Sequence, residues 1–261
     1  MLNRFLFLAL ILQIIVGCSS DDGNESTIEG NVLTRTIAKT SAGAVVEEET
    51  FEYIGNKLYK KTITSVPGYF IYEYTGDLIT KVSKFENNAL ASTELYTYND
   101  NGDMIESKFR SNNSDLGYRT TYGYNNDQTI TVTTFSGTSD TQNTVQFRRK
   151  VYLQNGSVIK LEEYSPGENV LTMILEFTYD DKNAPYNNIP GYTKIKRFEF
   201  NLIGETNNIT KYRYASAANP AQVLERTGVY EYNGSNFPTK AMFSTPPQLI
   251  NQPSVLNFYY R

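Results

Sequence analysis

The chain of 261 residues contains no histidine, no tryptophan and a single cysteine, Cys18. The absence of histidine excludes the Ser-His-Asp and Cys-His catalytic constellations and the usual histidine-containing catalytic zinc sites. One cysteine cannot form an internal disulfide. No GxxxxGK[ST] or GxGxxG motif occurs, which argues against a nucleotide cradle. We therefore expect no enzymatic activity, no catalytic, cofactor-binding or metal-binding residues, and no cofactor.

Basic residues are also in slight deficit, with 24 Lys and Arg against 28 Asp and Glu. A mildly acidic chain without a long basic run is a poor ligand for nucleic acid, and we expect no nucleic-acid partner.

The N-terminus has the pattern of an export signal. Residues 5–16 are almost wholly apolar after Arg4, and this run is too short for a spanning helix, which needs about 20 residues. It ends Ile15-Val16-Gly17-Cys18, which resembles the lipobox of bacterial lipoproteins. The resemblance implies that residues 1–17 are removed and that the sulfur of Cys18 carries a lipid that inserts into the bilayer. The alternative is an ordinary secretory signal followed by a chance cysteine.

Residues 18–31 are small, polar and acidic after Cys18 and predict a flexible tether. Asp21 and Asp22 resemble the acidic signal that sends Bacteroidota lipoproteins to the outer face of the outer membrane. The resemblance implies an outer membrane lipoprotein exposed at the cell surface. A merely solvated tether, with the protein facing the periplasm, is the alternative.

A repeated unit fills the remainder of the chain. Its core is an aromatic residue, any residue and Tyr, followed by a turn with Gly or Asn and then aliphatic residues, as in Tyr72-Glu73-Tyr74 before Gly76. The spacing of two places both rings on one face of a strand. Gly and Asn supply the positive φ of tight hairpin turns. The Gly residues expected in this role are Gly55, Gly76, Gly102, Gly156 and Gly234, with Asn183 in the same slot once.

These units predict an all-β protein: a long antiparallel hairpin meander of roughly 16 strands over residues 32–261, forming a single repetitive β domain. So wide a sheet curls or closes, and we expect a barrel-like or half-barrel sheet with Tyr and Phe inside. The Asn- and Pro-rich residues 183–191 predict an irregular loop, and the four prolines in residues 237–253 predict loop with at most a short strand.

The Tyr-x-Tyr-(Asn/Asp)-x-x-Gly unit resembles a degenerate YD repeat, the hairpin unit of Rhs and teneurin shells. The lipobox, the chain length and the segment FTYDDKNAPY, residues 177–186, resemble a Bacteroidota lipoprotein family of unknown function with a porin-like β fold. Neither resemblance implies a catalytic residue. The chain departs from the unit at Lys150, which replaces a ring, and at Gly123.

Several short motifs have competing interpretations. The high tyrosine content favours a core role for most rings, with Tyr74, Tyr98, Tyr124 and Tyr179 as candidates for a ligand-binding platform. Residues 99–103, NDNGD, predict a hairpin turn rather than a calcium loop, because Thr97 and Lys108 stand where acidic ligands belong. Asp180-Asp181 also predicts a turn rather than a metal site.

Charged residues are spread along the predicted strands. Glu47 and Glu49 share a strand face that we expect to be solvated, and Arg148-Arg149-Lys150 points its charges to alternating faces. A barrel that spans a membrane needs an apolar outer band, which six charged residues interrupt: Lys60, Lys84, Glu106, Lys108, Lys160 and Glu162.

The sequence therefore favours a non-catalytic binding or structural module of the cell envelope, anchored in the bilayer through acylated Cys18. The expected partner is an envelope glycan, a polysaccharide or another envelope protein. Two alternatives remain at this point: a carboxylate-based glycan hydrolase, and a carrier of a small apolar ligand inside the rolled sheet.

Overall fold

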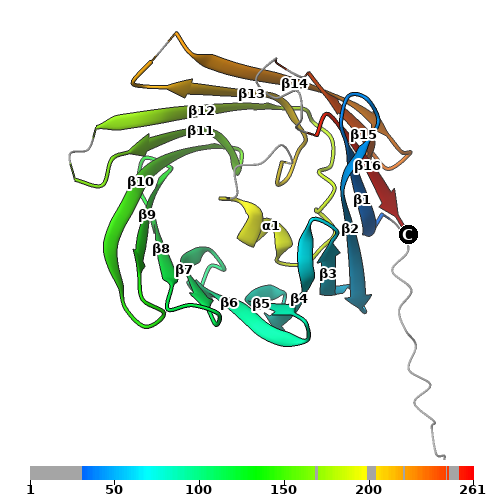
Figure 1. The fold of residues 1–261 in the computed structure, drawn as a ribbon. Helices are drawn as coiled ribbons and strands as arrows, with labels where there is room; N and C mark the ends of the chain where they lie inside the picture. Colours follow the sequence, from blue (N-terminus) through cyan, green and yellow to red (C-terminus); the bar gives the residue numbers. More distant parts are fainter. Residues whose placement is uncertain (1–30, 168–169, 199–203, 220, 245, 247–252) are drawn as a thin grey trace, which may run out of the picture.

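The computed structural model describes residues 31–261 except 168–169, 199–203, 220, 245 and 247–252, and in this part the chain forms one closed antiparallel β-barrel (Figure 1). Each strand pairs with its sequence neighbours, and β1 closes the ring against β16. The predicted hairpin meander of about 16 strands is confirmed. Closure pairs the backbone N–H and C=O groups that would be left unpaired at the two edges of an open sheet.

The sixteen strands are six to thirteen residues long. They are β1 (Leu33–Lys39), β2 (Val45–Ile54), β3 (Lys57–Ile63), β4 (Val66–Thr75), β5 (Leu78–Glu86), β6 (Ala89–Tyr98), β7 (Met104–Ser111), β8 (Gly117–Tyr124), β9 (Thr129–Gly137), β10 (Gln142–Gln154), β11 (Ser157–Tyr164), β12 (Leu171–Tyr179), β13 (Ile209–Ser216), β14 (Val223–Tyr232), β15 (Pro238–Phe243) and β16 (Val255–Tyr260).

The second tyrosine of the repeated unit has a recurring structural role. The Tyr98 hydroxyl on β6 donates to the backbone carbonyl of Ile79, at the start of β5, over 2.7 Å. Tyr53, Tyr124, Tyr179 and Tyr260 make the same contact with the strand before their own, and in the unit Tyr230-Glu231-Tyr232 it is the first tyrosine, Tyr230, that does so. Burial raises the pKa of Tyr98 and of Tyr179, so these hydroxyls stay protonated and donate. The repeat in the sequence is therefore a repeated latch between neighbouring strands.

The barrel has two distinct ends. We call tether end the one that holds Asn31, the C-terminal Arg261 and the turns that follow the tyrosine motifs, and far end the opposite one. At the tether end Gly55, Gly76, Gly102 and Gly156 have positive φ as predicted. Gly234 does not, and that prediction is wrong: in the same turn Asn236 takes the left-handed conformation, with φ 62°.

The two faces of the wall follow from strand alternation. Phe51 and Tyr72 point into the lumen, where they belong to the buried core. Residues paired across neighbouring strands point to the same side, so alternation and register, counted from the lumenal rings, identify the outer face. That face carries a circumferential series of ion pairs, two of them within one strand (Lys108–Glu106 and Lys160–Glu162) and six between adjacent strands: Arg35–Glu48, Lys60–Glu52, Lys81–Glu73, Arg213–Glu176, Lys211–Glu225 and Lys240–Glu231.

The described residues of the connection between β12 and β13, 180–198 and 204–208, fold back into the lumen, and we call them the plug (Figure 1). It contains the one helix of the described residues, α1 (Tyr192–Lys196), which starts after Gly191 with φ 68°. Residues 183–191 are irregular, as predicted, and residues 237–253 contain one short described strand, β15. Within the described part of the chain, no helix has the length and hydropathy needed to cross a membrane.

Candidate functional site

The plug packs on the lumenal wall through aromatic rings. Tyr192 is fully buried, with its ring 6.0 Å from Tyr72 on the wall and 4.9 Å from Tyr186 within the plug. Tyr186 lies 6.2 Å from Phe51. Ring pairs at these separations add about 0.5–1.5 kcal/mol each beyond their buried area. The tether-end half of the lumen is therefore a packed core.

A buried ion pair of two wall residues contacts the plug. Lys61 on β3 is 6% exposed, and its Nζ lies 3.0 Å from Oε1 of Glu49 on β2 and 3.4 Å from the Tyr192 hydroxyl. The Tyr186 hydroxyl donates to Oε2 of Glu49 over 3.5 Å. The expectation that Glu49 lies on a solvated face is wrong: closure of the sheet turns that face inward, where Lys61 neutralises the carboxylate.

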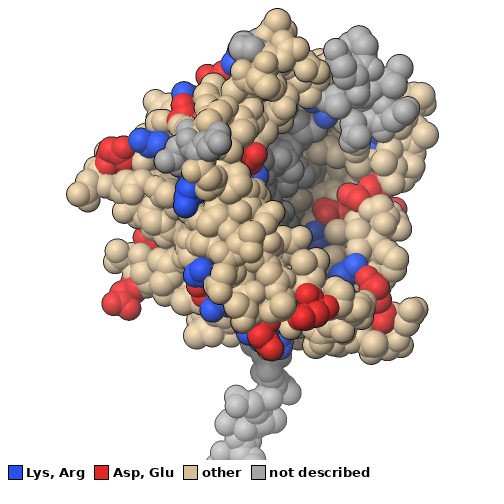
Figure 2. Space-filling model, turned by 60° about the vertical axis from the view of Figure 1, so that its left-hand side comes forward, with Lys and Arg blue, Asp and Glu red and all other residues tan. Residues whose placement is uncertain are grey.

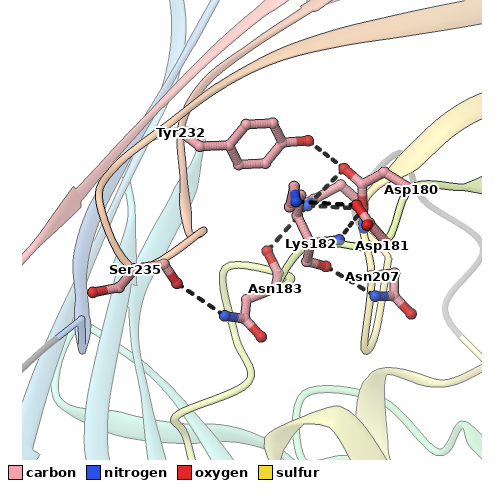
Figure 3. Close-up of polar contacts among 8 residues, drawn as sticks. Asp180, Asp181, Lys182, Asn183, Asn207, Tyr232 and Ser235 are labelled. Atoms are coloured by element: carbon pink, nitrogen blue, oxygen red, sulfur yellow. Dashed lines mark hydrogen bonds and ion pairs between the residues drawn. The ribbon is translucent and has the colours of Figure 1, made fainter.

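Asp180 closes the base of the plug (Figure 3). Its carboxylate accepts hydrogen bonds from the Tyr232 hydroxyl, from the backbone N–H of Lys182 at 3.0 Å, and from both the backbone and side-chain N–H groups of Asn208. Asn208 is 1% exposed and immediately precedes β13. One carboxylate thus fixes the first and last residues of the plug, a contact set that we call the clasp.

A second carboxylate is buried inside the plug. Glu205 accepts a hydrogen bond from Nε of Arg197 over 3.0 Å. Burial raises the pKa of Glu205 to about 8, although the Arg197 guanidinium acts in the opposite direction. The same burial holds Tyr179 protonated beside it.

Glu205 makes barrel stability depend on pH. The unfolded chain loses this proton at the ordinary carboxyl value, whereas the folded chain keeps it to about pH 8. The folded state therefore binds more protons across that window, and the free energy of unfolding falls as pH rises. We expect the melting temperature to drop by roughly 4–8 °C from about pH 5 to pH 9, the equivalent of on the order of 2 kcal/mol. Glu205→Gln should flatten this dependence, whereas Glu225→Gln on the outer wall should leave it unchanged.

The far half of the lumen is polar, and Figure 2 shows a hollow at one end of the barrel with acidic and basic side chains along it. Register places Lys84, Glu86, Glu94, Arg149 and Glu163 on the lumenal face there, and we call these residues the mouth. Arg149 donates both Nε and Nη2 to one oxygen of Glu163, at 2.9 and 2.8 Å, and Lys84 pairs with Glu86. These partly exposed ion pairs line an entrance that water reaches.

The predicted site residues do not come together in one place. Cys18, with the predicted signal and tether residues before Asn31, lies outside the described residues. Tyr98, Tyr124 and Tyr179 are three of the latches, and their hydroxyls are engaged by wall carbonyls. The Tyr74 hydroxyl is buried beside the Leu58 backbone without hydrogen-bond geometry. The hydrogen bonds give Tyr98, Tyr124 and Tyr179 a structural role, and a ligand-binding platform of the four rings stays a prediction.

Other motifs have clear structural outcomes. In the turn at residues 99–103 the Asn99 side chain accepts from the N–H groups of Asn101 and Asp103, the geometry of a hairpin turn. The basic cluster alternates as predicted, with Arg149 in the lumen and Arg148 and Lys150 outside. Of the six charges expected to interrupt an apolar outer band, Lys84 points into the lumen and the other five point outward.

The structure also gathers functional residues that the sequence did not single out. Lys61 and Glu94 reach the lumen only because the sheet closes, and no local pattern marks them. Two hollows of about 660 and 650 Å³ lie on the outer wall. The first is lined by residues of β10 to β13, among them Lys160, Glu176 and Arg213, and the second by residues of β2 to β6.

No protein-family model and no curated protein matches this chain. Among solved structures it is similar to a porin-like protein from Bacteroides vulgatus, with a TM-score of 0.56 and 12% identity over 89% of this chain and 99% of the other. A porin-like protein from Bacteroides uniformis gives a TM-score of 0.51 and 12% identity over 88% and 97%. The fold is porin-like. The porin-like part of the predicted resemblance is thus confirmed, and a relation to YD repeats stays a prediction.

Proposed function

We propose that this chain is a lipid-tethered barrel that stands in water and serves as a non-catalytic binding module of the cell envelope. The observation that carries the proposal is the series of ion pairs around the outer wall, such as Lys60–Glu52 at 2.8 Å and Lys160–Glu162 at 2.8 Å. Barrels that span membranes present an apolar band about 25 Å tall, and a basic residue at its midplane costs about 2–4 kcal/mol. A water-exposed wall incurs no such cost.

The path of the chain supports the tether. Asn31 lies at the tether end, where its side-chain oxygen accepts from Asn233 over 2.6 Å and its carbonyl accepts from Asn188 of the plug over 3.2 Å. A lipid on Cys18 would then hold the plugged end towards the bilayer, within on the order of 45 Å. The mouth would face away from the membrane, available to a partner from solution.

The other two functions have less support from the contacts. A carrier of apolar ligands needs an apolar cavity, whereas the plug occupies the apolar half of the lumen and charged residues line the mouth. A glycan hydrolase needs a carboxylic acid that can reach its substrate, whereas Glu163 is paired with Arg149 and the protonated Glu205 is 9% exposed inside the plug.

Solubility tests the proposal. The mature chain carrying Cys18→Ser should remain monodisperse without detergent and should not release dye or conduct ions when added to liposomes. The acylated wild type should sediment with membranes, and protease treatment of intact cells should degrade it if the barrel is displayed on the surface. A Cys18→Ser protein that requires detergent, or that opens pores in liposomes, would overturn the proposal.

A further inference from the structure

The hollow on the outer wall over β2 to β6 combines two ion pairs of the outer series with a stacked pair of aromatic rings. Tyr69 on β4 and Phe85 on β5 stack with centroids 5.3 Å apart and planes 12° apart. Tyr59, 42% exposed, lines the same hollow of about 650 Å³. Register places Tyr69 and Phe85 on the outer face, so this hollow, which we call the outer groove, is separate from the lumen.

Charged groups border the rings in balanced pairs. Lys60 lies 2.8 Å from Glu52 and Lys81 lies 2.8 Å from Glu73, and all four side chains line the outer groove. Ser83, which is 3% exposed, lies between Ile71 and Thr93 on the neighbouring strands and also lines it. The groove thus combines aromatic and aliphatic surface with carboxylates and ammonium groups at fixed positions.

We propose that the outer groove binds a neutral oligosaccharide. A sugar has an apolar C–H face that packs on aromatic rings and a rim of hydroxyls that hydrogen-bond to charged side chains. The volume falls within the 300–1,000 Å³ usual for small-ligand sites.

The balance of two carboxylates and two ammonium groups favours a neutral, hydroxyl-rich ligand over an anionic, cationic or apolar one. An anionic ligand would meet Glu52 and Glu73, and a cationic one would meet Lys60 and Lys81. A wholly apolar ligand would strip water from all four charges without replacing their hydrogen bonds, which costs several kcal/mol. A neutral polyhydroxylated ligand keeps both ion pairs and adds hydrogen bonds to them.

This inference rests on the proposed function, since the outer groove is accessible only if the wall faces water. Titration calorimetry of the mature Cys18→Ser chain tests it. The neutral ligands are maltotriose, cellotriose, mannotriose and triacetylchitotriose, and trigalacturonate is the charged comparison. At least one neutral trisaccharide should bind with Kd of about 1 mM or tighter. Tyr59→Ala combined with Glu73→Gln should weaken that binding at least tenfold.

Tyr259→Ala is the matched control, because Tyr259 is 39% exposed on the outer wall of β16 and has Arg35 over its ring. This variant should bind like the parent, and the melting temperatures of all variants show whether they are folded. The inference is overturned if the panel shows no neutral ligand, if trigalacturonate binds more tightly than every neutral sugar, or if the groove variant binds unchanged. A chain that is soluble without detergent but binds no sugar would remove the groove site and leave the water-exposed barrel intact.

Discussion

Lys61→Met should lower the free energy of unfolding by about 3–5 kcal/mol, because it removes one partner of a buried ion pair and leaves the other charged. Lys61 and Glu49 have side chains that are only 7% and 14% exposed, and Nζ and Oε1 are 3.0 Å apart. Methionine keeps much of the side-chain volume, so the loss reports on charge rather than on a cavity. Urea or thermal unfolding followed by circular dichroism measures it, with a fall in melting temperature of roughly 6–20 °C.

Lys60→Met is the matched control, one residue away on the same strand. Lys60 also pairs with a glutamate, Glu52 at 2.8 Å, but on the outer wall, where water screens the charges. Such a pair contributes about 0–1 kcal/mol. The double variant Lys61→Met with Glu49→Gln should recover part of the loss, since no unpaired charge remains. Equal effects of the Lys61 and Lys60 substitutions would contradict a buried ion pair on the lumenal face.

Asp180→Ala should open the clasp and cost about 2–4 kcal/mol. The substitution removes the acceptor of the Tyr232 hydroxyl and of the Asn208 backbone N–H, and it leaves the buried Asn208 amide with only the Asn183 carbonyl. Each unsatisfied buried group costs about 1–3 kcal/mol. Because Asp180 holds both ends of the plug, we expect the plug to become susceptible to limited proteolysis before the wall does. Mass spectrometry of the first fragments should place the cuts within residues 180–208.

Asp181→Ala provides the comparison at the adjacent position. The Asp181 side chain is 86% exposed and has a 3.3 Å contact with Lys182. Its loss should leave both the melting temperature and the pattern of proteolysis within error of the wild type. Cuts in the wall strands before the plug in Asp180→Ala would show that the clasp stabilises the barrel as a whole instead of closing the plug.

The local part of the fold follows from the sequence. The pair Tyr96 and Tyr98 has period two, which places both rings on one face of β6, and the Gly102 turn reverses the chain with positive φ. These signals depend on neighbouring residues, so they predict strands, turns and the strand count. Such signals do not always identify which residue of a turn takes the positive φ. In the turn at residues 233–237 it is Asn236 and not Gly234, because Asn tolerates the left-handed conformation too.

Of the plug, the sequence predicts only an irregular loop at residues 183–191, and there is a physical reason for this. The helix α1 is five residues long, which is too short to show a period of 3.6. Its Tyr192 packs on the ring of Tyr72 on a distant strand, so the contact that places it is non-local. The clasp is equally non-local, because Asp180 and Tyr232 are far apart in the sequence. Asp180 and Tyr232 come together only when β12 and β14 lie in the same closed wall.

By itself the sequence determined the alternation of side chains along each strand and the corners between strands, because both depend on φ and ψ preferences of adjacent residues. Only the tertiary structure decided which face became the lumen. Closure turned Glu49 inward to meet Lys61 and left Glu52 and Lys60 in water. Pairing of the consecutive strands β3, β4 and β5 gathered Tyr59, Tyr69 and Phe85 into one outer groove. A period of two is the same for both faces of a strand, so the side that is buried depends on pairing between distant segments.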